Sequence, residues 1–207
     1  QFWGRDEFAL VFGDYEVNIT VPSDHILDGT GELQNRKEVF SKEMIKRYEQ
    51  AKKSYEEPVV IVTQDEADEA SKGFLNSKKT WKFKAKNVRD YAFATSRRFI
   101  WDMMAVKLGS RDVMAVSMYP KEGNPLWEDW STKVVASTLI SYSRMTFDYP
   151  YPKAISVHAK NQGMEYPMIC WNYGRPDSDG TYSDRVKYGM FGVVIHEIGH
   201  NYFPMII

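Results

Sequence analysis

The chain contains almost no cysteine: Cys170 is the only one among 207 residues. A single cysteine excludes an internal disulfide. It also makes a metal site built from thiolates implausible, because such sites use two or more cysteines. We therefore expect Cys170 to be a small, buried, apolar residue rather than a reactive one.

The chain also lacks an excess of charge of either sign and a long apolar run. Its formal net charge is −1, which argues against binding a nucleic-acid backbone, since that requires a basic surface. No apolar stretch approaches the length that crosses a bilayer, so no transmembrane segment is predicted. No signal peptide is present, but Gln1 is not a natural first residue. We take the start as a processing boundary or an artificial one, so the compartment stays open.

What the first half does contain is alternation of apolar and polar residues. Residues 8–12 and 15–21 both alternate with a period of two, which predicts an antiparallel pair ending at Pro22. A charged stretch follows, with apolar residues at helical spacing. Residues 1–110 are therefore predicted to form a β-rich domain with a charged helical insertion at about 36–72. Further strands are expected at residues 59–62, 81–85, 91–95 and 111–120.

The second half mixes helices and strands. Apolar residues at helical spacing predict a helix of about five turns over residues 126–145. A strand is expected at 153–159, and a final helix from about 184 toward Phe203, with Pro204 helping to end it. We predict an α+β protein with a second domain over residues 111–207.

The final helix carries the sequence His-Glu-x-x-His. His196 and His200 are four residues apart, so a helix places both imidazoles on one face, close enough to share a tetrahedral metal ion. Glu197 projects toward the position where a water would sit. The five residues therefore supply two metal ligands and a general base, which is the pattern of zinc-dependent hydrolysis. Zn²⁺ is the predicted cofactor.

The residues after His200 narrow the class of zinc enzyme. A metzincin would have glycine at position 203 and histidine at 206, where this chain has Phe203 and Ile206. The remaining large class takes a glutamate ligand from a later helix. Since the sequence continues for 7 residues after His200, we expect an incomplete site, low zinc occupancy and little or no activity for this chain.

Two short motifs together resemble one family. The segment GMEYP (163–167) is similar to the G-x-M-E-N motif of the zinc aminopeptidases typified by aminopeptidase N and leukotriene hydrolase. It precedes HEIGH by about thirty residues, as in that family. HEIGHNYFP resembles the variant found in bacterial members. The segments YPYPK (149–153) and NVRDYAFATSRRF (87–99) are similar to parts of the same family, so the resemblance covers nearly the whole chain.

The resemblance implies a role for each matching residue. His196 and His200 match the zinc ligands, and Glu197 matches the general base. Glu165 matches the glutamate that pairs with the free α-amino group of the substrate. Gly163 and Met164 match the segment whose backbone aligns the peptide. Tyr166 departs from the family's usual asparagine, which puts the hydrogen bonds of that position in doubt.

The resemblance also implies a fold and a reaction. The fold would be the C-terminal part of an all-β N-terminal domain followed by the first half of a thermolysin-like zinc metallopeptidase catalytic domain. The reaction would release N-terminal residues from peptides with a free N-terminus. Two alternatives stay open: a thermolysin-like endopeptidase and a non-catalytic interaction module on the same fold. The bacterial variant is often exported, which favours an exported or periplasmic protein.

Overall fold

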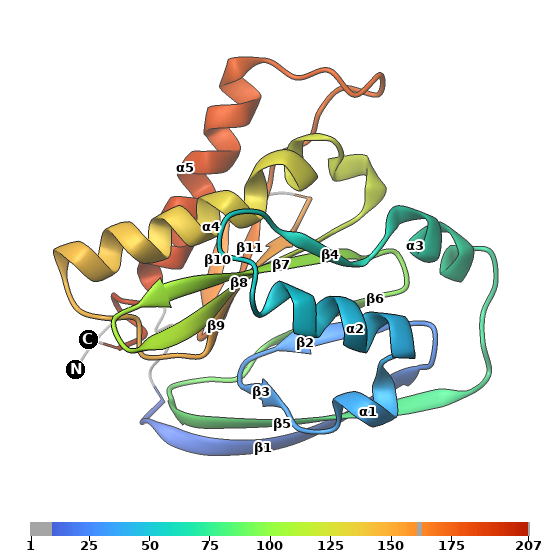
Figure 1. The fold of residues 1–207 in the computed structure, drawn as a ribbon, viewed down its shortest axis with the longest axis horizontal. Helices are drawn as coiled ribbons and strands as arrows, with labels where there is room; N and C mark the ends of the chain where they lie inside the picture. The colour runs from blue at the N-terminus through green and yellow to red at the C-terminus, as the bar shows by residue number, and fades with distance from the viewer. Residues whose placement is uncertain (1–9, 161–162, 207) are drawn as a thin grey trace, which may run out of the picture.

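The computed structural model describes residues 10–160 and 163–206, and its architecture is α+β, as predicted (Figure 1). The elements, in chain order, are β1 (Gly13–Pro22), β2 (Ile26–Gly29), β3 (Glu32–Leu33), α1 (Arg36–Val39), α2 (Lys42–Ala51), β4 (Val59–Val62), α3 (Gln64–Ser71), β5 (Lys78–Val88), β6 (Phe93–Ser96), β7 (Ile100–Leu108), β8 (Arg111–Tyr119), the 3-10 turn η1 (Lys121–Gly123), α4 (Leu126–Met145), β9 (Lys153–His158), β10 (Met164–Tyr166), β11 (Ile169–Asn172) and α5 (Asp184–His200). No helix in the described part is long and apolar enough to span a membrane.

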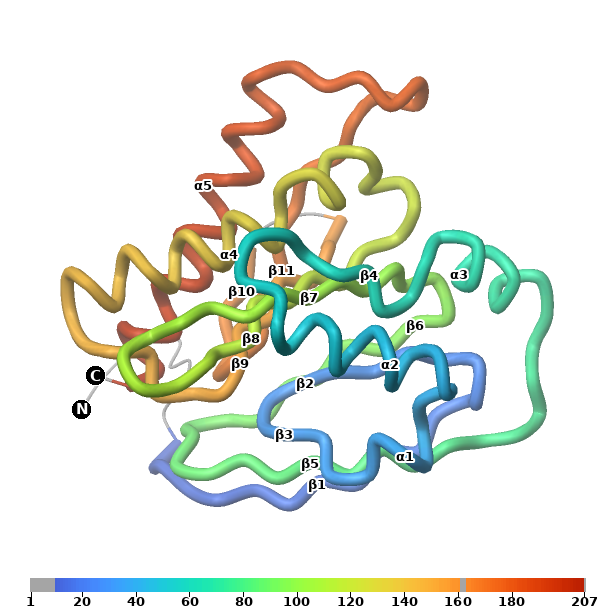
Figure 2. Tube along the Cα trace, viewed as in Figure 1, coloured from blue at the N-terminus to red at the C-terminus, as the bar shows by residue number. Residues whose placement is uncertain are grey.

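A six-stranded mixed sheet organises the molecule, in the order β10-β11-β9-β8-β7-β4. Strands β8, β9 and β11 are parallel to one another, and the remaining pairs are antiparallel. Helix α4 connects β8 to β9, as a parallel connection requires. A three-stranded sheet, β1-β5-β3, and the β2-β6 pair lie beside it, and Figure 2 shows the chain passing between these layers.

Both faces of the central strands are buried, because two apolar clusters lie on opposite sides of the six-stranded sheet. Along β8, Val113 and Ala115 belong to one cluster, whereas Val116 and Met118 belong to the other. Strand β7 reads as an almost continuous apolar run, with every residue but one buried. Burial on both faces removes the alternation that marks a strand. The sequence analysis therefore did not predict β7.

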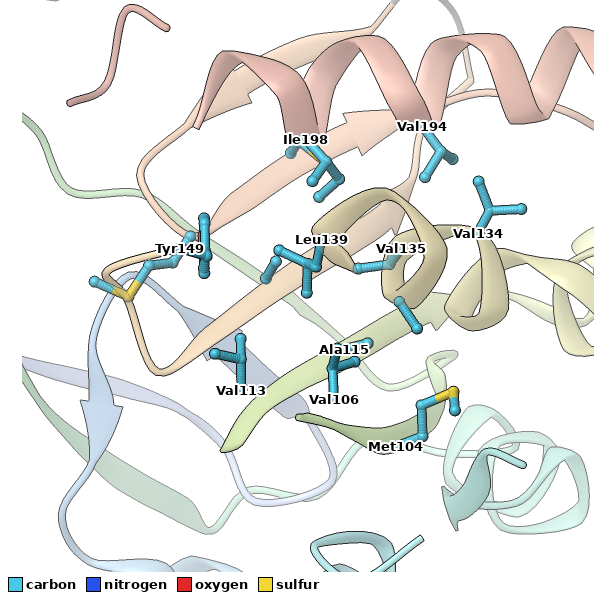
Figure 3. Close-up of a cluster of buried hydrophobic side chains, with 14 of the residues drawn as sticks. Met104, Val106, Val113, Ala115, Val134, Val135, Leu139, Tyr149, Val194 and Ile198 are labelled. Carbon is cyan, nitrogen blue, oxygen red and sulfur yellow. The ribbon is translucent and has the colours of Figure 1, made fainter. Parts of the chain in front are cut away.

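Helices α4 and α5 cover one face of the sheet. Val135 and Leu139 of α4 pack between Ala115 of β8 and the buried face of α5, which presents Val194 and Ile198 (Figure 3). Burying an aliphatic side chain of this size stabilises the fold by roughly 1.5–3 kcal/mol. The buried face of α5 is thereby held against α4, and its orientation follows from this packing.

The predicted pairing at the start of the chain is wrong in the described residues. Residues 10–12 form no strand, and Phe8 lies outside the described residues. Strand β1 instead pairs with β5, with Val17 opposite Phe83. Alternation identifies a half-buried strand, but it carries no information about which distant strand will cover it.

Other local predictions hold with shifted bounds. The insertion at 36–72 contains α1, α2 and α3, interrupted by the buried strand β4. The side chain of Ser41 caps α2 by accepting a hydrogen bond from the Met44 amide, so α1 and α2 are separate helices. Helix α5 ends at His200 rather than at Phe203. Cys170 is buried, as expected.

The division into two domains at residue 110 stays a prediction. Residue 110 falls in the turn between β7 and β8, and these strands pair from Ile100–Tyr119 to Leu108–Arg111. A boundary there would separate two paired strands of one sheet. Strand β4, from the predicted insertion, pairs with β7 in that same sheet.

Asp102 of β7 is a buried carboxyl that should make folding stability depend on pH. It accepts hydrogen bonds from Tyr119, at 2.6 Å, and from Thr132. Burial raises its pKa from the ordinary 3.8 to about 7, against the opposing effect of those two hydrogen bonds. Because the folded-state pKa is the higher one, the stabilisation is complete below about pH 4 and is lost as the pH rises through 7.

We therefore expect the free energy of unfolding to fall more steeply with pH in the natural protein than in Asp102→Asn. The expected difference in slope is on the order of 1 kcal/mol per pH unit between about pH 5 and 7. Urea unfolding at a series of pH values measures it. The control is Asp177→Asn, at an exposed aspartate. Equal slopes for the natural protein and Asp102→Asn would show that Asp102 does not titrate in this range.

Candidate metal centre

Helix α5 places the two predicted ligands on the face opposite the core. The Ser183 side chain caps the helix by accepting from the Val186 amide, and Val194 and Ile198 anchor it to α4. Gly199 permits a close approach, since a Cβ there would lie 2.8 Å from the Tyr142 hydroxyl oxygen. His196 is exposed and His200 is half-buried, so α5 is buried along one stripe and not all round.

The two imidazoles meet at their Nε2 atoms, which lie 3.0 Å apart. His200 Nδ1 lies 2.9 Å from the backbone carbonyl oxygen of Phe203. A carbonyl can only accept, so Nδ1 carries the hydrogen and the Nε2 lone pair of His200 is free for a metal. Two nitrogens bound tetrahedrally to zinc at about 2.0–2.1 Å lie about 3.3 Å apart. The pair fits a shared ion after a small movement.

Glu197 is a buried carboxyl without a complete set of partners. Glu197 is 5% exposed, and its Oε2 has no hydrogen-bond partner among the described residues. Burial raises the pKa of Glu197 to about 7, and repulsion from the Glu165 carboxylate adds to the effect, whereas His200 lowers it. Burying a carboxylate oxygen without a hydrogen-bond partner costs free energy. A ligand bound beside His196 and His200 would provide a partner for Oε2.

Glu165 reaches this centre from the edge of the sheet. It lies on β10, opposite Cys170 of β11. Opposed residues of two paired strands point to the same face, and Cys170 belongs to the cluster under α5. Glu165 therefore faces α5, and its Oε1 lies 3.8 Å from His200 Nε2. Ligand atoms of Glu165, Glu197 and His200 all lie within 4.8 Å of one another and could hold a metal ion.

Gly163 and Met164 occupy different environments. Gly163 lies against Glu197, because a Cβ at position 163 would be 2.0 Å from Oε1 of that carboxyl and 2.8 Å from Val193. Met164 lies opposite Trp171, so it faces away from the metal centre. Tyr166 shares that other face, and its ring packs edge-on against Trp171, 5.7 Å between centroids. The substrate-binding role predicted for Gly163 and Met164 stays a prediction.

A methyl group at position 163 should displace Glu197 without touching the histidines. In the full-length protein, we expect Gly163→Ala to lower the hydrolytic turnover that the His-Glu-x-x-His pattern predicts by about tenfold or more, since a displacement of about 1 Å at a reacting group is costly. Zinc affinity should change little in the same variant. Chelator competition and steady-state kinetics measure the two effects. Gly73→Ala is the control, because a Cβ there meets nothing within 4 Å. Unchanged turnover would mean that Glu197 relaxes freely.

Asn201 is a site residue that the sequence analysis did not identify. It directly follows His200 and is fully buried, and its side chain contacts the turn after β10. The available signal was a polar residue at the end of a helix with an apolar face. His25 and His158 do not join the centre. His25 contacts Thr95, and His158 accepts from Arg175.

The fold resembles solved zinc metallopeptidases. No protein family and no curated protein matches the sequence. Among solved structures, an M1 zinc metallopeptidase from Deinococcus radiodurans has a TM-score of 0.56 and 15% identity over 94% of this chain. A mutant of a two-domain M1 zinc metallopeptidase bound to L-arginine has a TM-score of 0.54 and 14% identity, also over 94% of this chain.

The fold is similar to part of these M1 zinc metallopeptidase structures. The chain spans about a third of the length of those structures, 34% and 35%. At this identity the likeness establishes the fold, and the chemistry has to come from the residues of the site. The His-Glu-x-x-His helix and the Glu165 strand are those residues.

Proposed function

We propose that this chain carries part of the active site of an M1-type zinc aminopeptidase. One observation carries the proposal: Glu165, which lies about thirty residues before His196 in the sequence, meets His200 and Glu197 at one place. A chance His-Glu-x-x-His sequence would have no reason to face a second carboxylate from a separate element. The M1 zinc metallopeptidase fold of the chain supports the same assignment.

His196 and His200 would hold the metal. Zinc bound there would supply Lewis-acid activation of water and of the scissile carbonyl. Glu197 is the base. It takes a proton from the attacking water and delivers the proton to the leaving amine. Its position suits this role, because Glu197 is buried beside the two histidines and its Oε2 has no hydrogen-bond partner among the described residues.

Glu165 binds the α-amino group of the substrate in this proposal. A carboxylate held at one distance from the metal admits only the first peptide bond to the reacting position, so cleavage is restricted to the N-terminus. Met164 begins the edge strand β10 and Gly163 directly precedes it, and an extended peptide can pair with the backbone of such an edge. One structural neighbour is described as bound to a Tyr-Ser-Ala substrate, which is compatible with a short peptide ligand.

The protein in its full natural length should hydrolyse aminoacyl chromogenic amides in a zinc-dependent way. An N-acetylated version of the same amide is the matched substrate. An aminopeptidase refuses the blocked form, whereas a thermolysin-like endopeptidase cleaves blocked peptides. A protein that binds zinc and hydrolyses neither would be the non-catalytic module. Hydrolysis of the blocked amide at the same rate as the free one contradicts the proposal.

We also propose a division into two units that differs from the predicted boundary at residue 110, because it assigns β4 and β7 to the second unit. Strands β1, β2, β3, β5 and β6 would form the β-rich unit, and the six-stranded sheet with α4 and α5 would form the catalytic one. This division keeps every strand pair within one unit. Limited proteolysis followed by refolding of the pieces tests it.

A further inference from the structure

The side chain of Asn201, which follows the last residue of α5, is buried and hydrogen-bonded to the turn after β10. Asn201 is 0% exposed, and its Oδ1 accepts from the Met168 amide at 2.6 Å and from the Tyr149 hydroxyl at 3.1 Å. The backbone amide of Met168 can only donate, so the side-chain atom of Asn201 that it meets is the oxygen. The side chain thus bonds a backbone group outside α5, and its Nδ2 also donates to the Glu197 carbonyl oxygen within α5, at 3.5 Å.

The turn that Asn201 holds has an unusual conformation. Tyr166 and Ile169 are paired, and Pro167 and Met168 form the turn between them. Met168 has a φ of +68°, a left-handed conformation that a side chain other than glycine rarely adopts. Such a conformation persists only when the contacts around it hold the backbone in place. The hydrogen bond from the Met168 amide to Asn201 is one of those contacts.

The other side of the turn is held by the β-rich part of the chain. The Thr30 hydroxyl donates to the Pro167 carbonyl at 2.7 Å, and the Gly31 amide lies 3.2 Å from the Met168 sulfur. The turn is thus hydrogen-bonded to Asn201 and to the β2–β3 connection, and the Met168 carbonyl also accepts from the Ile155 amide of β9 at 2.9 Å. Of these bonds, the one to Asn201 joins the turn to the end of α5.

Two short chain segments link this contact to the two carboxyls. Glu165 lies three residues before Met168, and Glu197 lies four residues before Asn201. We propose that Asn201 is a positioning residue that sets the distance between Glu165 and Glu197. The inference rests on the proposed function, because a fixed carboxylate spacing matters for an enzyme that measures from the substrate amine to the metal.

The test compares Asn201→Ala and Asn201→Asp with the natural protein, all in full length and loaded with zinc. The probes are L-leucinamide and N-acetyl-L-leucinamide, titrated by calorimetry, and zinc affinity comes from chelator competition. The aspartate variant keeps an oxygen acceptor for both the Met168 amide and the Tyr149 hydroxyl. Asn35→Ala is the matched control, since Asn35 is a buried asparagine that bonds the Thr80 carbonyl and the Lys82 amide far from the centre.

The natural protein should prefer the free amine by about tenfold or more, as a charge-assisted contact allows. Asn201→Ala should lose that preference while zinc affinity stays within about twofold, and Asn201→Asp should restore most of the preference. The control should lose thermal stability but keep the preference. Retained preference in Asn201→Ala, no recovery in Asn201→Asp, or an equal loss in the control each overturns the proposal.

A natural protein without any amine preference would refute the proposed function rather than the role of Asn201. In that case, crystal structures of the natural protein and Asn201→Ala decide. The Glu165–Glu197 carboxyl separation should grow by about 1 Å when the contact is lost. A separation unchanged in Asn201→Ala overturns the inference.

Discussion

In the full-length protein, replacing Glu197 by glutamine should lower the kcat of the proposed peptidase by between about 10²- and 10⁴-fold, the usual contribution of a general acid–base. Glutamine has the same shape, so His196 and His200 keep their places and zinc affinity should change little. The expected result is a protein that binds zinc and substrate but turns over slowly. Steady-state kinetics on an aminoacyl chromogenic amide, with zinc content measured on the same sample, tests it.

Stability gives a second measurement for the same substitution. Glu197 is buried, and the neighbouring Glu165 carboxylate repels its charged form. Since glutamine carries no charge, Glu197→Gln should not unfold more easily than the natural protein at neutral pH. Glu56→Gln, at an exposed glutamate, is the control. Undiminished turnover in Glu197→Gln would eliminate Glu197 as the base.

Replacing Glu165 by glutamine should remove the preference for a free N-terminus. Its side chain is 15% exposed, so a contact with an ammonium group is partly shielded from water. Losing such a pair commonly costs a few kcal/mol, which is about 10²-fold in kcat/KM. The loss should apply to substrates with a free amine and leave N-acetylated ones nearly unchanged. Kinetics with the two matched amides gives the ratio directly.

The effect of Glu165→Gln also distinguishes an aminopeptidase from a thermolysin-like endopeptidase. An endopeptidase that uses the same helix has no need of a carboxylate for the substrate amine, so its ratio of free to blocked cleavage would not move. Glu128→Gln, at an exposed glutamate of α4, controls for a general loss of negative charge. A parallel fall for both amides would assign Glu165 to the metal or to the fold.

Local chemistry was readable from the sequence because it depends on residues close in the chain. The spacing of His196 and His200 follows from the helical period, and it correctly places their Nε2 atoms together. Elements with one solvent-exposed face, such as β5 and α4, were also predicted, because their apolar residues recur with the period of a strand or a helix. Strand β7 was not, since burial on both faces erases the periodic signal.

The partners of strands and the contacts between elements were decided by the tertiary structure. Alternation in β1 showed a strand but not that β5 would cover it. Likewise, nothing in the order of residues shows that Asn201 meets the amide of Met168, 33 positions earlier in the chain. Such contacts depend on how the sheet and α5 pack, which is a property of the whole core.

The sequence by itself determined which helix carries the candidate metal ligands and gave Glu165 a family resemblance. Both rest on short motifs whose geometry is local. Only the folded chain decided that Glu165 faces α5. The face of the sheet on which the Glu165 side chain lies depends on the register of β10 with β11 and on Cys170 lying in the core. The folded chain also decided that Glu197 is buried and that its Oε2 has no hydrogen-bond partner among the described residues. Burial of a side chain depends on elements that are distant in sequence, so a short motif does not predict it.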